Sequence, residues 1–239
     1  MHSFVRLSRS QKARGLYTNV SEIGGHPDRI VADFLLSAPT LQECPPEGVP
    51  EVAIVGRSNS GKSSVLNQLT RNRQLARTSK TPGRTQLLNF FTTSHGGRLV
   101  DLPGYGYARV AKSQKHLWED NVEDYLAHRI DLVAIVLVMD CRRPFEPFDL
   151  MMINWARQTS VPMHVLLNKA DKLKHGAQTV ALRGARERLE LPLFSLQLFS
   201  AQTGLGRDEA IEKLSYWLTP QHLRIAAAAE SPIAANKHE

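Results

Sequence analysis

The sequence predicts a three-layer α/β domain with a mostly parallel six-stranded sheet, one antiparallel edge strand and helices on both faces. Short apolar runs alternate with amphipathic stretches at helical spacing from residue 51 to residue 218. The run LVAIVLVMD at 132–140 is continuously apolar, which is typical of a strand buried on both faces. Two neighbouring runs, 87–93 and 98–103, are separated only by SHGG, and this spacing predicts a hairpin that supplies the antiparallel strand.

The remaining elements follow from the same periodicities. Strands are expected within 51–56, 87–93, 98–103, 132–140, 161–171 and 191–201. Helices are expected at 61–71, 116–129, 148–158, 177–190 and 206–218. Four prolines in 38–50 predict a segment without regular structure. These elements define one domain at 29–220, preceded by a basic flexible arm at 1–28 and followed by a flexible tail at 221–239.

Composition narrows the class of protein. The chain has 239 residues, 42% of them apolar, so it can bury a substantial core. Its net charge of +7 and isoelectric point near 9.6 favour an anionic partner such as RNA or a membrane surface, although a generally basic soluble protein has the same charge. Cys44 and Cys141 lie far apart in the sequence and predict two unpaired thiols in a reducing compartment.

No segment predicts membrane insertion or secretion. The longest apolar run, 132–139, has eight residues and is too short to span a bilayer. Four basic residues near the N-terminus have no apolar segment behind them, which argues against a secretory signal. We therefore expect a cytoplasmic protein, and we expect a monomer.

The stretch GRSNSGKS at 56–63 fits the phosphate-loop pattern, and it follows an expected strand and opens an expected helix. Gly56 and Gly61 let the backbone wrap around a phosphate, whose charge faces backbone N–H groups and the helix N-terminus. Lys62 can reach the terminal phosphates, and the Ser63 hydroxyl can bind Mg²⁺. A glycine-rich turn capped by Ser63 is the alternative, and the strand–loop–helix context argues against it.

Two further segments predict contacts with the terminal phosphate. In DLPG, Asp101 ends a strand at the ligand-binding edge of the sheet and can hold Mg²⁺ through a water, while Gly104 can offer its N–H to the phosphate. In KTPGRTQ, Thr85 is expected to complete the Mg²⁺ shell when the terminal phosphate is present. Thr81 competes for this role, but Thr85 directly precedes the strand that leads back to Asp101.

The motif NKAD at 168–171 predicts the base. Asp171 can accept hydrogen bonds from the N1–H and the amine of guanine, and adenine cannot supply that pair of donors. Asn168 can bond the base and fasten the phosphate loop, and the Lys169 stem can cover the ring. In FSA at 199–201, the N–H of Ala201 could bond the guanine carbonyl.

In this order, GRSNSGKSS, TPGRTQLLNFF, DLPGYGYA and NKAD resemble the EngB (YihA/YsxC) family of bacterial GTPases, over about residues 25–219. The resemblance implies a Ras-like G domain, Mg²⁺-dependent GTP binding and hydrolysis to GDP, and a role in assembly of the large ribosomal subunit. It also implies a requirement for normal cell division and septation. We therefore expect the large subunit or its precursor, including its rRNA, as the partner.

Together the motifs and the resemblance give one candidate site. The catalytic residues are expected to be Lys62, Thr85 and Gly104, and the metal ligands Ser63 and Thr85. The nucleotide is expected to contact Gly56, Arg57, Ser58, Asn59, Ser60, Gly61, Lys62, Ser63, Gly83, Arg84, Thr85, Gln86, Leu87, Asp101, Leu102, Pro103, Gly104, Asn168, Lys169, Ala170, Asp171, Phe199, Ser200 and Ala201.

Tyr105 follows DLPG where the best-known signalling GTPases carry a glutamine that positions the attacking water. The missing stabilisation could come from Arg84 as an internal arginine finger, from the ribosomal particle, or from K⁺. Asn59 favours K⁺, because GTPases that resemble this chain and use potassium share this asparagine; a hydrogen bond that stabilises the loop is the alternative role for Asn59. We expect slow basal turnover. A GTP-gated RNA- or ribosome-binding module without hydrolysis is the alternative. A phosphotransferase is a third hypothesis, and the NKAD motif argues against it.

Overall fold

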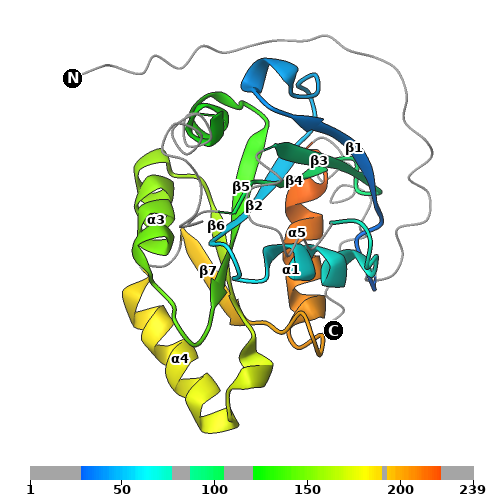
Figure 1. Cartoon of the computed structure of the whole chain (residues 1–239). Coiled ribbons are helices and arrows are strands. Elements are labelled where there is room, and N and C mark those ends of the chain that lie inside the picture. The colour runs from blue at the N-terminus through cyan, green and yellow to red at the C-terminus, as the bar shows by residue number, and fades with distance from the viewer. Residues whose placement is uncertain (1–27, 77–86, 105–120, 190–192, 222–239) are drawn as a thin grey trace, which may run out of the picture.

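In the computed structural model, which describes residues 28–76, 87–104, 121–189 and 193–221, one seven-stranded sheet runs through the domain (Figure 1). The strand order is β1-β3-β4-β2-β5-β6-β7. The strands are β1 (Ala32–Ala38), β2 (Glu51–Gly56), β3 (Leu88–Thr93), β4 (Arg98–Asp101), β5 (Leu132–Asp140), β6 (Met163–Asn168) and β7 (Phe194–Leu198).

The strand directions confirm a mostly parallel α/β sheet, with two corrections. Parallel pairing joins β4, β2, β5, β6 and β7, and the expected hairpin is present because β3 pairs antiparallel with β4. The sheet has seven strands, not six, and the antiparallel strand β3 is not at the edge, because β1 pairs with its other side. The sequence does not mark β1, since Asp33, Phe34 and Leu35 are all exposed and a bulge interrupts the alternation between Phe34 and Leu36.

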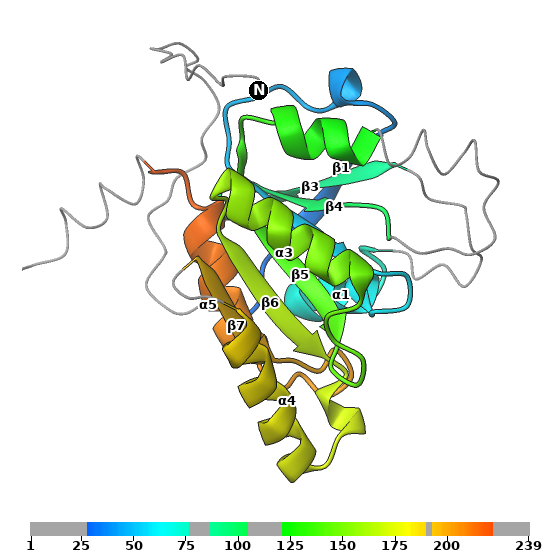
Figure 2. The same cartoon turned by 90° about the vertical axis from the view of Figure 1, so that its left-hand side faces the viewer.

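The helices cover both faces of the sheet, as expected for three layers (Figure 2). They are α1 (Lys62–Thr70), α3 (Pro147–Thr159), α4 (His175–Arg188) and α5 (Arg207–Leu218), and residues 121–128 are helical too. Short 3₁₀ turns lie at Leu41–Glu43, within the proline-rich segment that predicts no regular structure, and at Ala170–Lys172. Among the described helices, none is long and apolar enough to cross a membrane.

The core is divided by the sheet into two apolar clusters. In β2, Val52 and Ile54 belong to the cluster that includes residues of α1 and α5, whereas Ala53 and Val55 belong to the cluster that includes residues of α3, α4 and helix 121–128. This alternation is the two-residue period of a strand buried on both faces. The helical period is visible in α1, which buries Val65, Leu66 and Leu69 as its spacing predicts.

The topology places the candidate site at one edge of the sheet. The chain leaves β2 toward β3 and β4 on one side and returns to β5 on the other. In open α/β sheets, ligands bind outside the carboxyl ends of the strands at such a switch point. The phosphate loop directly follows β2, and DLPG and NKAD begin where β4 and β6 end, so all three motifs meet at this edge.

The opposite end of β2 is fastened by a buried polar network. The carboxylate of Glu51 is fully buried and accepts hydrogen bonds from Arg129 at 2.7 and 2.9 Å and from the Tyr125 hydroxyl at 3.0 Å. Arg98 forms a further ion pair with it at 3.1 Å. The network anchors the end of helix 121–128 to the strand that carries the phosphate loop.

Candidate functional site

The phosphate loop depends on glycine at two positions. A Cβ on Gly56 would lie 2.6 Å from the carbonyl oxygen of Val138, so only glycine lets the loop pack closely on β5. Gly61 has a φ of 96°, in the left-handed region, and a Cβ there would collide with the side-chain amide of Asn168. The loop therefore turns tightly between β2 and α1, as the sequence predicts.

Polar groups of the loop fit an anionic ligand. The Ser58 and Ser60 hydroxyl oxygens are buried and have no hydrogen-bond partner among the described residues. Since buried polar groups are nearly always paired, two such hydroxyls in one loop indicate that a ligand supplies their partners. The N-terminus of α1 also has no side-chain cap at Gly61, so its N–H groups remain available to a phosphate.

The phosphate loop and DLPG meet through charged side chains. Lys62 and Asp101 form a buried ion pair, which joins the start of α1 to the end of β4. The N–H of Leu102 donates to the carbonyl of Ile54 at 3.1 Å, and Leu102 and Pro103 are buried. This bond continues the pairing of β4 with β2.

Two of the remaining phosphate-site residues also lie at this junction. Gly104 is close to the loop, since a Cβ on it would lie 3.5 Å from the Ser58 backbone. Ser63 is half-buried in the first turn of α1, next to Lys62.

Asn168 connects three of the predicted segments. Its side-chain Nδ2 donates to the backbone oxygen of Ser60 at 2.9 Å, which fastens the phosphate loop as expected. Its Oδ1 accepts from the N–H of Ala201 at 3.1 Å. Ala170 is also tied to the 199–201 loop, because its N–H donates to the carbonyl of Phe199 at 3.1 Å. The base motif and the 199–201 loop are therefore held together with the phosphate loop.

The carboxylate of Asp171 is held in a fixed orientation. Ser200 donates to its Oδ1 at 2.6 Å, and Lys172 forms an ion pair with Oδ2 at 3.1 Å. The hydrogen bond from Ser200 is the main cause of a pKa for Asp171 below the ordinary value, and Lys172 adds to it. Asp171 is thus ionised at neutral pH and presents an acceptor, which is the form that recognition of guanine requires.

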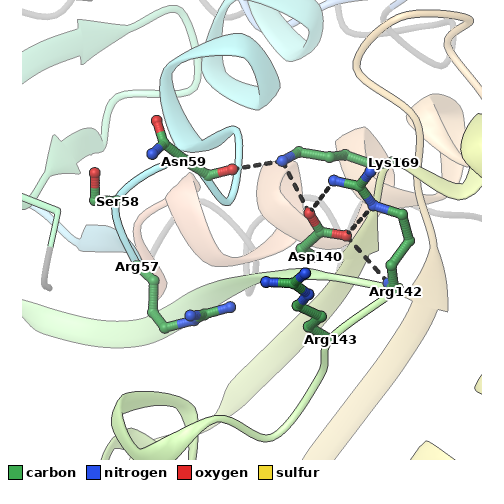
Figure 3. Close-up of a pocket in the computed structure, with 7 residues that line it drawn as sticks. All are labelled: Arg57, Ser58, Asn59, Asp140, Arg142, Arg143 and Lys169. Carbon is green, nitrogen blue, oxygen red and sulfur yellow. Dashed lines mark hydrogen bonds and ion pairs between the residues drawn. The ribbon is translucent and has the colours of Figure 1, made fainter.

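Lys169 makes two contacts that the sequence does not predict. Its Nζ donates to the backbone oxygen of Asn59 at 2.5 Å and pairs with Asp140 at 2.9 Å (Figure 3). Arg142 binds the same carboxylate with two guanidinium nitrogens, at 2.6 and 2.9 Å. Burial raises the pKa of Asp140, but the hydrogen bonds from Arg142 and Lys169 outweigh it and hold that pKa well below its usual range.

Asp140 and Arg142 are therefore functional candidates that the motifs missed. The sequence does contain a signal for Asp140, because this residue ends the run LVAIVLVMD at the same edge of the sheet as Asp101. In each case a carboxylate ends a buried parallel strand beside the phosphate loop.

Part of the predicted site lies outside the described residues. This part comprises Gly83, Arg84, Thr85 and Gln86, together with Thr81 and Tyr105. Leu87 is described and half-buried, and its carbonyl accepts a bond of 3.4 Å from Asn89. Of the two expected Mg²⁺ ligands, only Ser63 is in the described part.

Comparison with known proteins gives a family match and a fold match. Residues 51–169 match the family described as "50S ribosome-binding GTPase". A probable GTP-binding protein EngB has a similar structure, with a TM-score of 0.57, 24% sequence identity, and coverage of 70% of this chain and 98% of that one.

Era is also similar in fold. Its complex with MgGDPNP and nucleotides 1506–1542 of 16S ribosomal RNA gives a TM-score of 0.56 at 22% identity, with coverage of 80% of this chain and 60% of that one. A point variant of Aquifex aeolicus Era bound to GDP.AlF4⁻ gives a TM-score of 0.55 at 22% identity, with coverage of 73% and 58%. These likenesses agree with the G-domain fold. From the family match over 51–169 and the motifs that meet at one sheet edge, we conclude that the chain belongs to the family of 50S ribosome-binding GTPases.

Proposed function

We propose that this GTPase is a switch in assembly of the large ribosomal subunit, docks on the particle in its GTP state, and is needed for normal cell division and septation. One observation carries the nucleotide-switch part of the proposal: Lys62, Asp101, Asn168 and Asp171 converge from separate segments on one sheet edge. The family match and the net charge of +7 support a ribosomal, RNA-rich partner. The same proposal places the protein in the cytoplasm as a monomer, with residues 29–220 as the GTP-binding domain. Residues 1–27 and 222–239 of the expected arm and tail lie outside the described residues.

The residues divide into three roles. The phosphate loop, residues 56–63, and Gly104 hold the phosphates, with Lys62 neutralising charge on the terminal groups. Asn168, Asp171 and the 199–201 loop hold guanine. Thr85, outside the described residues, senses the terminal phosphate.

Mg²⁺ fits the donor set of this site. Ser63 supplies a hydroxyl in the first turn of α1, close to the ion pair of Lys62 and Asp101. With Thr85 and the phosphate oxygens, it would form the all-oxygen shell that Mg²⁺ prefers. The bound ion would neutralise charge on the phosphates.

Sedimentation of the protein with ribosomal particles tests the role directly. The full chain is mixed with purified large subunits and centrifuged with GDP or with a non-hydrolysable GTP analogue. We expect co-sedimentation with the analogue and release with GDP, because the terminal phosphate orders the switch segments. Absence from the large-subunit fraction in both states would exclude the proposal. A phosphate-release assay separates a GTPase from a binding module that does not hydrolyse GTP.

Potassium is the proposed source of the charge that Tyr105 cannot supply. Asn59 is exposed in the loop with a φ of 66°, and Figure 3 shows its side-chain amide directed away from Lys169. We expect faster GTP hydrolysis in KCl than in NaCl at equal ionic strength, and loss of the difference in Asn59→Ala. Equal wild-type rates in the two salts would leave Arg84 or the particle as the source.

A further inference from the structure

A basic pocket lies beside the phosphate loop, on the side of the β5–α3 connection (Figure 3). Its volume is about 520 Å³. Residues 57–59 form one wall, and Asp140, Arg142, Arg143 and Lys169 form the other. Arg57 belongs to the phosphate loop, but none of the motifs that define the nucleotide site includes Arg142 or Arg143.

Two of the arginines are not neutralised by hydrogen-bonded partners. Asp140, which is the only carboxylate lining the pocket in the described part of the chain, is occupied by Arg142 and Lys169. Among the described residues, the guanidinium groups of Arg57 and Arg143 donate no hydrogen bond. Arg57 has Glu146 and Asp149 at 3.8 and 3.9 Å, beyond hydrogen-bond distance. The N–H donors of both guanidinium forks therefore remain available to a ligand.

The arrangement favours an anion between the two forks. In Figure 3 the guanidinium groups of Arg57 and Arg143 are directed toward the same space. Like charges facing one another repel, and a guanidinium fork matches the oxygens of a phosphate or carboxylate. Counting Glu146 and Asp149 at the margin, four cationic side chains meet three carboxylates. The excess of one positive charge matches one phosphodiester.

We propose that this pocket binds a single phosphate of an RNA backbone and thereby lays an RNA strand against the outer wall of the phosphate loop. The inference deepens the proposed function, because it rests on a ribosomal, RNA-containing partner.

The surroundings favour RNA over an acidic peptide. The chain is basic overall, at +7. A further cation, Arg188, lies next to the pocket. Its guanidinium carbon is 4.9 Å from the centre of the Phe145 ring, and Phe145 follows Arg143 by two residues. Phosphates repeat regularly along a strand, so one strand could reach both positions.

Arg143 is the position at which to test the pocket, because it lies outside the expected nucleotide contacts and its side chain has no partner among the described residues to lose. A fluorescent oligouridylate of about 20 nucleotides is titrated with the full chain in the GTP-analogue state, and binding is followed by anisotropy. The titration is repeated between about 50 and 200 mM KCl. Arg143→Gln should bind several-fold more weakly, and its log K against log[salt] slope should fall by about 0.7, the loss of one phosphate contact on a single strand.

Two further variants and one competitor complete the design. Arg143→Lys should restore the salt slope but only part of the affinity, because it keeps the charge and loses the fork. Arg73→Gln removes an exposed arginine beyond the end of α1 and should match the wild type. Binding of fluorescent GDP to Arg143→Gln should equal the wild type, which shows that the variant is folded. Polyglutamate should not compete with the oligouridylate.

The outcomes separate the pocket from the ribosomal role. Equal affinity and slope in Arg143→Gln and Arg73→Gln would overturn the pocket assignment, even if the wild type sediments with large subunits. Displacement of the RNA by polyglutamate would overturn it in favour of an acidic protein partner. If RNA binding depends on Arg143 but the protein never sediments with large subunits, the pocket is supported and the ribosomal role is excluded.

Discussion

Asp140 acts through its neighbours rather than through a ligand. Its carboxylate holds Lys169, which in turn binds the backbone of Asn59, so three residues form a chain from β5 to the phosphate loop. The backbone of Lys169 is strained in this arrangement, because its φ of 65° lies in the left-handed region. The loop is therefore braced on this side by Lys169 and on the other by Asn168.

Removing the charge of Asp140 should weaken nucleotide binding. In Asp140→Asn, the amide no longer neutralises Lys169 and Arg142, and Lys169 loses its main anchor. For such a partly exposed pair we expect a cost of about 1 kcal/mol, or about fivefold in the Kd for GDP. Fluorescent GDP binding measures the change. Asp208→Asn, which breaks the exposed pair of α5 with Arg207, is the matched control. An unchanged Kd would mean that the bond to Asn59 alone positions Lys169.

Motif residues and their supporting residues differ in how well the sequence reveals them. Lys62 and Asp101 belong to spaced patterns whose chemistry requires them to meet, and they do form an ion pair. Asp140 belongs to no pattern, since its role depends on a partner 29 residues away and on strand pairing that places β5 beside β6. The position of Arg57 in the phosphate loop is predictable. The direction of its side chain depends on the start of α3, where Asp149 lies 3.9 Å from its guanidinium group, and the sequence alone does not reveal that contact.

At the level of elements, a buried histidine joins β6, β7 and α5. His164 is 2% exposed, and its ring nitrogens bond Ser195 and Gln197 of β7, each at 2.8 Å. The ring of Trp217 in α5 packs edge-on against the His164 ring, with 6.4 Å between the ring centroids. Gln197 also donates to the carbonyl of Gly206, which fixes the start of α5. The histidine is neutral in this setting, because burial disfavours its charged form.

Acid should weaken this junction. The pKa of His164 is lowered from 6.5 to about 4, mainly by burial, which outweighs the opposing effect of the hydrogen bond with Gln197; the charge of Lys213 contributes to the lowering. The unfolded chain therefore binds a proton that the folded chain does not, so stability falls as pH drops from about 6.5 to about 4. The loss reaches about 3 kcal/mol at the acid end.

Urea unfolding at several pH values measures this effect. His164→Gln should be less stable at pH 7 and should show a flatter pH dependence between about pH 6.5 and 4.5 than the wild type. His128→Gln, at an exposed position on helix 121–128, should retain the wild-type slope. An identical slope in His164→Gln would assign the acid sensitivity to other groups.

The elements also show why β1 was missed while the other strands were found. The runs of β2, β5 and β6 are apolar because both of their faces are covered, so hydropathy alone reveals them. β1 lies at the edge, with Phe34 exposed and a bulge after it, and it exists because β3 offers it a partner. That partnership depends on tertiary structure rather than on local periodicity.

At the scale of the whole molecule, the candidate site joins strands from both halves of the sheet. Asp101 comes from β4, the phosphate loop from β2, Asp140 from β5, and Asn168 from β6. A ligand at this edge contacts segments that are far apart in the sequence and adjacent only when the sheet is complete. Nucleotide binding and global stability should therefore be linked, because the unfolded chain offers no such site.

Guanine nucleotides should accordingly raise the unfolding temperature, by an amount that grows with the logarithm of the ratio of their concentration to their Kd. GDP at about 100 times its Kd should add about 2.7 kcal/mol, which for a domain of this size is roughly 5 to 10 °C. The shift should vanish in Lys62→Met at the same GDP concentration. The GDP-induced shift is compared, and not the absolute midpoint, because the substitution also leaves Asp101 without its ion-pair partner and so changes stability without any ligand. ATP at equal concentration should leave the midpoint unchanged, because adenine cannot satisfy the carboxylate that Ser200 holds in place. A shift with ATP as large as that with GDP would show that Asn168 and Asp171 do not select the base, whatever the phosphate loop binds.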